Sequence, residues 1–125
     1  MTNEKGKSYK DLEIYQLAFE VAVRIYHKTL ELPSHDKFEA GSQIRRSSQG
    51  IKDAIVEGYG RRKYKNDFLK FLIYAHASAL EAISQAEFLH RVHPDNGWSI
   101  IATELEIIGS KIHNFTDYVE KFWRT

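Results

Sequence analysis

The chain has 125 residues, of which 42% are hydrophobic and 28% are charged, and it contains no cysteine. This composition predicts one globular domain over residues 1–125, and it excludes disulfide bonds, cysteine-bound zinc and thiol chemistry. The first ten residues are polar, and no apolar run approaches the roughly 20 residues of a membrane helix. We therefore expect a cytoplasmic protein that does not enter a membrane, with a flexible N-terminus over residues 1–8.

The net charge is only +1, but the charge is unevenly distributed along the chain. Residues 43–65 carry seven Lys or Arg against two Asp or Glu, whereas residues 66–125 carry five against eight. A local excess of this kind indicates an anionic partner better than the net charge does. The alternative is a basic surface that contacts only solvent. The seven basic residues are Arg45, Arg46, Lys52, Arg61, Arg62, Lys63 and Lys65.

The first two predicted helices lie on either side of Pro33. The first covers about Tyr9 to Leu30, and the spacing of its apolar residues predicts one buried face. That face consists of Leu12, Tyr15, Phe19, Ala22 and Tyr26. The second covers about Asp36 to Glu57, and Gly58 and Gly60 are expected to end it. Its buried stripe consists of Ile44, Ser48, Ile51 and Ile55.

The last two predicted helices carry the longest apolar stripes. The third covers about Tyr64 to Val92, with a stripe of Phe68, Leu72, Ala75, Ala79, Ala82, Ala86 and Leu89. The fourth covers about Trp98 to Trp123, with a heptad-like stripe of Ile101, Leu105, Ile108, Ile112, Phe115, Val119 and Phe122. No segment alternates with period two for long enough to form a strand. The expected fold is therefore all-α, an antiparallel up-and-down four-helix bundle.

The second predicted helix also has a polar face on the side away from its apolar stripe. Arg46, Gly50, Asp53 and Glu57 lie roughly 180–240° around the helix from Ile44. A small residue among charged ones is suited to a contact between subunits, so these four residues are the predicted oligomer interface. A plain solvated face is the alternative.

Several short motifs occur in the order and spacing of a known family. They are Tyr9-Lys10-Asp11-Leu12-Glu13, Gln43-Ile44-Arg45-Arg46, Glu57-Gly58-Tyr59-Gly60-Arg61, Asp67-Phe68, Phe71-Leu72 and Ser78-Ala79-Leu80-Glu81. Over residues 9–90 the chain resembles the four-helix-bundle proteins encoded in intervening sequences of bacterial 23S ribosomal RNA genes. It departs from the family pattern at Gly50, Lys52 and Ala54, where serine, often proline, and asparagine are usual.

The resemblance implies a homo-oligomeric bundle, expected to be a pentamer, and no established activity. A related branch of the family, the accessory protein of diversity-generating retroelements, binds a reverse transcriptase and nucleic acid through a basic surface. RNA or DNA and a protein are therefore the expected partners besides a second copy of the chain.

The segment Arg61-Arg62-Lys63-Tyr64-Lys65 combines basic residues with an aromatic one. Lys and Arg neutralise phosphates, and a tyrosine can stack on an unpaired base. The predicted nucleic-acid-binding residues are Arg45, Lys52, Arg61, Arg62, Lys63 and Lys65. Alternatively, some of the arginines pair with Asp53, Glu57 or Asp67 and hold the turn or a subunit contact.

The sequence offers little for catalysis or metal binding. Di-iron bundles need two Glu-x-x-His motifs, and this chain has one, at Glu87 and His90. We therefore predict no catalytic residues, no metal and no cofactor. The predicted function is non-enzymatic binding of RNA or DNA without sequence preference. The alternative is a protein-interaction scaffold, whose basic turn recruits an acidic partner or whose motif only supports assembly of the oligomer.

Overall fold

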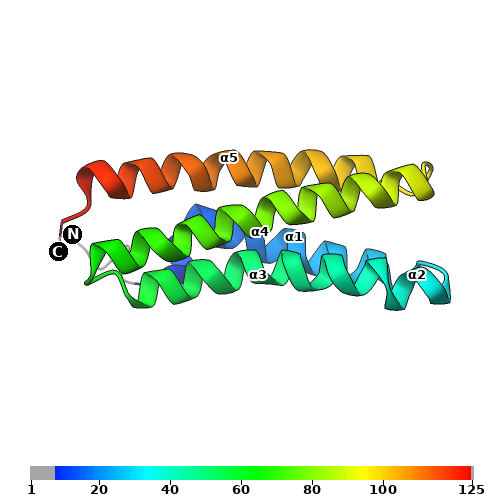
Figure 1. The fold of residues 1–125 in the computed structure, drawn as a ribbon, viewed down its shortest axis with the longest axis horizontal. Coiled ribbons are helices and arrows are strands. Elements are labelled where there is room, and N and C mark those ends of the chain that lie inside the picture. Colours follow the sequence, from blue (N-terminus) through cyan, green and yellow to red (C-terminus); the bar gives the residue numbers. More distant parts are fainter. Residues whose placement is uncertain (1–7, 125) are drawn as a thin grey trace.

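The computed structural model describes residues 8–124, which form a bundle of four long helices (Figure 1). A short 3₁₀ turn, Tyr9–Asp11, precedes the helices α1 (Glu13–Thr29), α2 (Ser34–Phe38), α3 (Ala40–Gly60), α4 (Lys65–Val92) and α5 (Trp98–Phe122). The long helices α1, α3, α4 and α5 alternate in direction, and α2 is a single short turn in the connection between α1 and α3. The predicted all-α four-helix bundle is confirmed, and residues 8–124 contain no strand.

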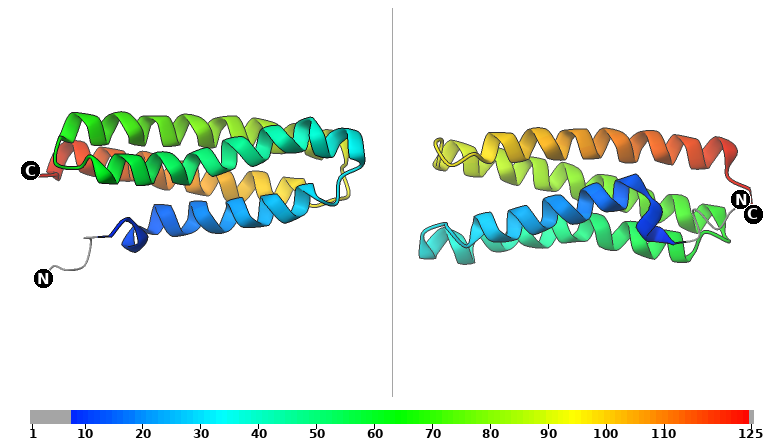
Figure 2. Two further views of the ribbon diagram at one scale, coloured as in Figure 1. Left: turned by 90° about the horizontal axis from the view of Figure 1, so that it is seen from below. Right: turned by 180° about the vertical axis from the view of Figure 1, so that it is seen from behind.

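The four long helices lie at the corners of a square. Around the bundle the order is α1, α3, α4 and α5, and the contact between α1 and α5 is the least extensive of the four (Figure 2). The α1/α3 side of the bundle therefore lies opposite the α4/α5 side. Because the helices alternate in direction, the start of α1, the α3–α4 turn and the end of α5 share one end of the bundle.

The core contains the stripes predicted for the second and third helices. Every residue of the stripes over residues 44–55 and 68–89 is buried, so both predictions are confirmed. The stripe of α5 is also buried from Ile101 to Val119, with Phe115 only partly covered. Phe122 was predicted in this stripe but is 60% exposed at the last residue of α5, so the prediction is wrong for this residue.

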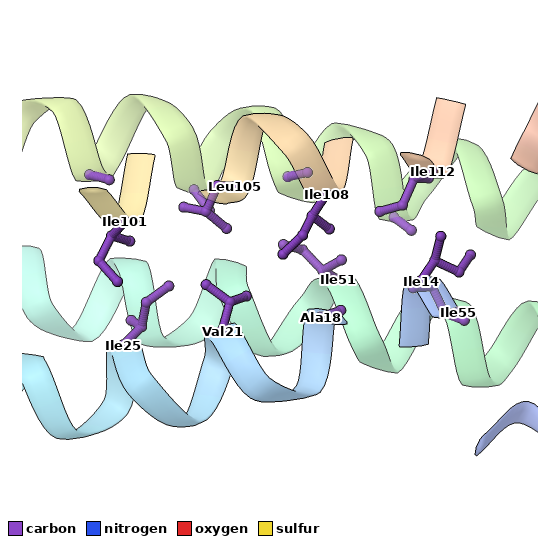
Figure 3. Close-up of a cluster of buried hydrophobic side chains, with 14 of the residues drawn as sticks. Ile14, Ala18, Val21, Ile25, Ile51, Ile55, Ile101, Leu105, Ile108 and Ile112 are labelled. Atoms are coloured by element: carbon purple, nitrogen blue, oxygen red, sulfur yellow. The ribbon is translucent and has the colours of Figure 1, made fainter. Parts of the chain in front are cut away.

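The predicted buried face of α1 is wrong. Its core residues are Ile14, Ala18, Val21 and Ile25, which point toward the isoleucines and leucine of α5 and toward α3 (Figure 3). Of the predicted stripe, Phe19 and Tyr26 are exposed, Leu12 and Tyr15 are partly buried, and Ala22 is buried. The predicted stripe follows a true apolar line on the helix, but that line lies about 110° around α1 from the centre of the core face. Helix α1 thus carries two apolar stripes.

Two helix boundaries differ from the predictions. Helix α1 begins at Glu13 rather than Tyr9, because Leu12 is in an extended conformation after the 3₁₀ turn. The second predicted helix is divided in two at Glu39, whose φ of −104° and ψ of −90° are not helical. Residues 1–7 lie outside the described residues, so the predicted flexible N-terminus stays untested there. Ser8 accepts a hydrogen bond from the backbone N–H of Lys10, which begins the 3₁₀ turn.

Gly58 lies inside α3, where the sequence predicted the end of the helix, and it is buried against α4. A Cβ atom at this position would lie 3.0 Å from Phe71 Cβ and 3.3 Å from Phe68 Cδ1. The glycine therefore allows α3 and α4 to approach closely next to the turn that joins them.

We expect Gly58→Ala to lower the free energy of unfolding by about 1–2 kcal/mol, because overpacking outweighs the better helix propensity of alanine. Gly60→Ala is the matched control, since its added Cβ would meet no other element of the described residues within 4 Å. Urea unfolding followed by far-UV circular dichroism measures both variants. Equal stabilities for the two variants would contradict the packing role of Gly58.

Candidate nucleic-acid interface at the turn between α3 and α4

The turn between α3 and α4 places four basic side chains within five residues. Backbone hydrogen bonds from Arg61 and Arg62 to the last turn of α3, and from Tyr64 to Arg61, fold this segment tightly. Arg61 and Lys63 are exposed, and Arg62 and Lys65 are partly exposed. The segment predicted to bind phosphates therefore lies at the surface, at one end of the bundle.

Arg61 is held by carboxylates of its own chain. Its guanidinium lies 2.9 Å from Glu57 Oε2 and 3.7 Å from Asp67 Oδ2, and it also covers the ring of Phe71 at 4.9 Å. These ion pairs join the end of α3 to the start of α4. Pairing with carboxylates of the chain was the alternative to phosphate binding that the sequence analysis gave for the arginines. The charge of Arg61 is thus largely balanced within the turn.

Arg62 is held without a carboxylate. Its guanidinium lies 4.0 Å from the centre of the Tyr59 ring and donates a hydrogen bond to the Tyr59 carbonyl, at 3.0 Å. The indole N–H of Trp123 donates to the Arg62 carbonyl at 3.3 Å. The aromatic contacts fix the position of the guanidinium and leave its positive charge unbalanced by any ion pair within residues 8–124.

Lys63, Tyr64 and Lys65 complete the turn. Tyr64 is 63% exposed, and Lys63 Nζ lies 5.8 Å from the centre of its ring. Neither lysine forms an ion pair with any residue between 8 and 124. Three cations without an ion pair in residues 8–124 therefore flank an exposed aromatic residue in the sequence, and such a combination is suited to contact with single-stranded nucleic acid.

Arg45 and Lys52 lie away from this turn. Sixteen residues of helix separate Arg45 from Arg61, which is about 24 Å along the axis. The Arg45 guanidinium donates to Thr29 Oγ1 at 2.8 Å and to the Lys37 carbonyl at 3.1 Å, and it thereby links α3 to the end of α1 and to α2. Lys52 Nζ lies 2.7 Å from Asp53 Oδ1. Arg45 is therefore engaged away from the turn, and the part of Lys52 in binding stays a prediction.

We expect Arg45→Ala to lower the free energy of unfolding by about 1–3 kcal/mol, because it removes two hydrogen bonds from a charged donor, one of them to a buried hydroxyl. Affinity for nucleic acid should not change. Arg46→Ala is the matched control, since within residues 8–124 that exposed guanidinium forms a single side-chain hydrogen bond, to Ser42 Oγ at 3.3 Å. Urea denaturation and RNA titration of both variants make the comparison. A loss of RNA affinity in folded Arg45→Ala would show that Arg45 belongs to the binding surface after all.

The sequence interpretation missed basic residues near the two ends of the chain. Lys10, Lys121 and Arg124 are exposed on the segments that share this end of the bundle with the α3–α4 turn. The hydrogen bond from Trp123 to Arg62 brings the end of α5 directly against the turn. The predicted up-and-down topology could have revealed these residues. It places the start of the first helix and the end of the last helix beside the turn between the second and third helices.

The predicted oligomer interface on α3 consists of side chains that already have partners in the chain. Asp53 pairs with Lys52, Glu57 pairs with Arg61, and Arg46 contacts a serine one turn earlier. Gly50 is half-buried against α4, where an added Cβ would lie 3.3 Å from Ser78 Oγ. The glycine thus serves the packing of α4 on α3, and the role of this face in assembly stays a prediction.

Two of the sequence motifs meet in a polar groove between α3 and α4. The groove has a volume of about 560 Å³ and is lined by Gln43, Arg46, Ser47, Ser78, Glu81 and Gln85. The Ser47 hydroxyl donates to Gln85 Oε1 across it. The motifs at residues 43–46 and 78–81 are therefore neighbours in space, which the sequence did not reveal.

These features define an all-helical bundle protein with a cation-rich turn at one end. Between residues 8 and 124 there is no group of three or more His, Asp or Glu side chains placed to hold a metal ion. No helix of the described part combines the length and apolar character needed to cross a bilayer.

The family model for the 23S rRNA-intervening sequence protein matches residues 10–114, and the chain belongs to this family. The match extends the resemblance seen over residues 9–90 through most of α5, so the family prediction is confirmed. Among curated proteins, none matches the sequence.

Proposed function

We propose that this protein is a non-enzymatic homo-oligomer that binds RNA or DNA, without sequence preference, through the basic α3–α4 turn. The observation that carries the proposal is the group formed by Arg62, Lys63 and Lys65. These cations form no ion pair within residues 8–124, and they flank the exposed Tyr64 in the sequence.

The chemistry of the turn favours contact with the backbone of a nucleic acid over reading of its bases. Guanidinium and ammonium groups bind phosphates and release counterions, and the tyrosine ring stacks on any base. The aromatic contact of Arg62 holds its guanidinium in place before binding, which lowers the entropy cost of the contact. Several copies in one oligomer would add their modest affinities.

Titration of labelled structured RNA at about 50 and 200 mM salt tests the proposal. If three cations of one protomer contact phosphates, the fourfold rise in salt should weaken binding by about 40-fold, and by more if several protomers engage. The absence of binding at the lower salt concentration, or an affinity that is the same at both salt concentrations, would overturn the proposal.

A protein-interaction scaffold is the second candidate function, because large apolar side chains are exposed along α1, α4 and α5. In that case the basic turn recruits an acidic protein partner or supports assembly alone. The same titration separates the two candidates: a scaffold keeps its oligomer mass and shows no salt-dependent affinity for RNA.

A further inference from the structure

Two histidine side chains from neighbouring helices lie beside each other in a groove between α4 and α5. The ring centres of His76 on α4 and His113 on α5 are 5.9 Å apart, and the ring planes are tilted by 51°. Both residues line the groove, which has a volume of about 560 Å³. His76 is partly exposed and the side chain of His113 is 63% exposed, so solutes can reach both rings. We call these two residues the histidine pair.

The ring nitrogens of the histidine pair are largely free of other partners. His76 forms no hydrogen bond or ion pair with any residue between 8 and 124. His113 has one polar neighbour in that part of the chain, Asp117, whose Oδ2 lies 3.6 Å from His113 Nε2. The neutral imidazole is the commonest metal ligand in proteins. The groove therefore holds two metal donors from different helices.

The separation of the two rings suits a single metal ion between them. Zn²⁺ binds an imidazole nitrogen at about 2.0–2.1 Å, which places the ion about 3.2 Å from the ring centre. Two rings on one ion then have centres about 5.2 Å apart at the tetrahedral angle, and about 6.4 Å apart on opposite sides of the ion. The observed 5.9 Å falls between these limits. Side-chain rotation is therefore enough to aim both rings at one ion, and the helices need not move.

We propose that the histidine pair binds a divalent transition metal ion of the Zn²⁺, Ni²⁺ and Cu²⁺ class and thereby links α4 to α5. Imidazole favours these ions, whereas Mg²⁺ and Ca²⁺ prefer oxygen ligands. Facing helices of a bundle are a usual source of metal ligands. The inference is independent of nucleic-acid binding at the α3–α4 turn.

The surroundings of the histidine pair fit such an ion. Asp117 can accept a hydrogen bond from the ring nitrogen of His113 that does not bind the metal, which orients the ring. Gly109 and Ser110 leave space on the α5 side of the groove for further ligands. No third His, Asp or Glu ligand is placed to join the pair within residues 8–124, so water molecules complete the coordination.

The sequence analysis predicted no metal because it considered Glu-x-x-His spacing within one helix. The histidine pair comes from two helices, so only the fold brings its members together. Two protein ligands hold an ion more weakly than the four of a structural zinc site. We therefore expect a dissociation constant of about 1–200 µM.

Isothermal titration of the full chain, without a histidine tag, with Zn²⁺ tests the proposal. We expect one ion per chain and no heat of binding with Mg²⁺. Because the ion binds the folded state, about 0.5 mM Zn²⁺ should also raise the Tm by roughly 2–8 °C.

Single substitutions assign the binding to the histidine pair. His76→Ala and His113→Ala should each weaken Zn²⁺ binding by at least tenfold and remove the rise in Tm. Neither side chain is buried, so both variants should fold, which far-UV circular dichroism checks. Asp117→Asn should keep the stoichiometry and weaken binding by about tenfold. His27→Ala is the matched control, since this exposed histidine of α1 lies beside Tyr26 rather than another histidine, and it should bind like the wild type.

Two outcomes would overturn the proposal. One is the absence of binding up to about 1 mM Zn²⁺. The other is an affinity that stays unchanged in both His76→Ala and His113→Ala, which would show that the ion binds elsewhere or only adventitiously. His90→Gln then tests the alternative location, because His90 and His93 lie near each other at the end of α4.

Discussion

Replacing Phe68 by alanine is expected to lower the free energy of unfolding by about 3–5 kcal/mol. The side chain is fully buried and lies at the centre of an aromatic cluster. Its ring centre is 6.3 Å from that of Tyr59, 6.1 Å from Phe115 and 5.1 Å from Trp123. These partners come from α3, from α5 and from the residue after α5. The cavity left by truncation cannot be filled by the movement of one element, so the cost should be near the upper part of the usual range.

The loss should also reach the basic turn, because two members of the cluster hold Arg62. Tyr59 lies under its guanidinium, and Trp123 donates to its carbonyl. We therefore expect amide hydrogen exchange at residues 61–64 to accelerate in Phe68→Ala under conditions where the rest of the bundle stays folded.

Urea unfolding measures the stability change, with Phe88→Ala as control. Phe88 is on the same helix but 59% exposed, so its truncation should change stability by less than about 0.5 kcal/mol. Similar losses for the two variants would show that the cluster around Phe68 does not carry the stability assigned to it.

The helices with a single apolar stripe were predictable from the sequence, and the helix with two stripes was not. In α3 one line of residues is apolar and buried, and in α4 the line with regular spacings of three and four residues is buried, although Ile73, Leu80 and Phe88 are exposed elsewhere on that helix. Helix α1 offers the line of Ile14, Ala18, Val21 and Ile25 and the line that includes Phe19 and Tyr26. Spacing along one helix does not decide which line faces the core, because the neighbouring helices decide it.

The end of α3 shows a second limit of local sequence patterns. A glycine that stops a helix and a glycine that lets another helix approach look the same in a sequence. Gly58 belongs to the second kind because of Phe68 and Phe71, which reach it from α4. The start of α4 was predicted within one residue, since Tyr64 and the turn before it interrupt the apolar pattern.

The candidate site was predictable where it is local and unpredictable where it depends on tertiary contacts. Residues 61–65 are adjacent in the chain and form one surface turn. Arg45 belonged to the same charged stretch of sequence, yet its partners are a threonine of α1 and a carbonyl of α2. When a stretch of basic residues continues along a helix, its side chains point to different sides and lie at different positions along the axis. Only the basic residues that are adjacent in the turn therefore form one surface.

Removing three charges together, by Arg62→Ala, Lys63→Ala and Lys65→Ala, is expected to abolish most of the salt-dependent affinity for RNA. Each phosphate contact contributes about 0.9 to the slope of log affinity against log salt, so losing three lowers that slope by about 2.7 per engaged protomer. Arg61 is left in place because its ion pairs to Glu57 and Asp67 hold the turn. The fold and the oligomer mass should therefore remain, and titrations of wild type and variant at two salt concentrations measure the difference.

The matched control removes the same net charge from the opposite end of the bundle, by Lys28→Ala, Lys37→Ala and Arg91→Ala. A general attraction between protein and RNA would weaken equally in both triple variants, because it depends on total charge. A surface built by the α3–α4 turn weakens only when the turn is changed, because phosphate contacts act at short range and are screened within about 10 Å at 0.1 M salt. Equal losses in the two variants would contradict the turn as the binding surface, and a loss confined to the control would transfer the site to the other end of the bundle.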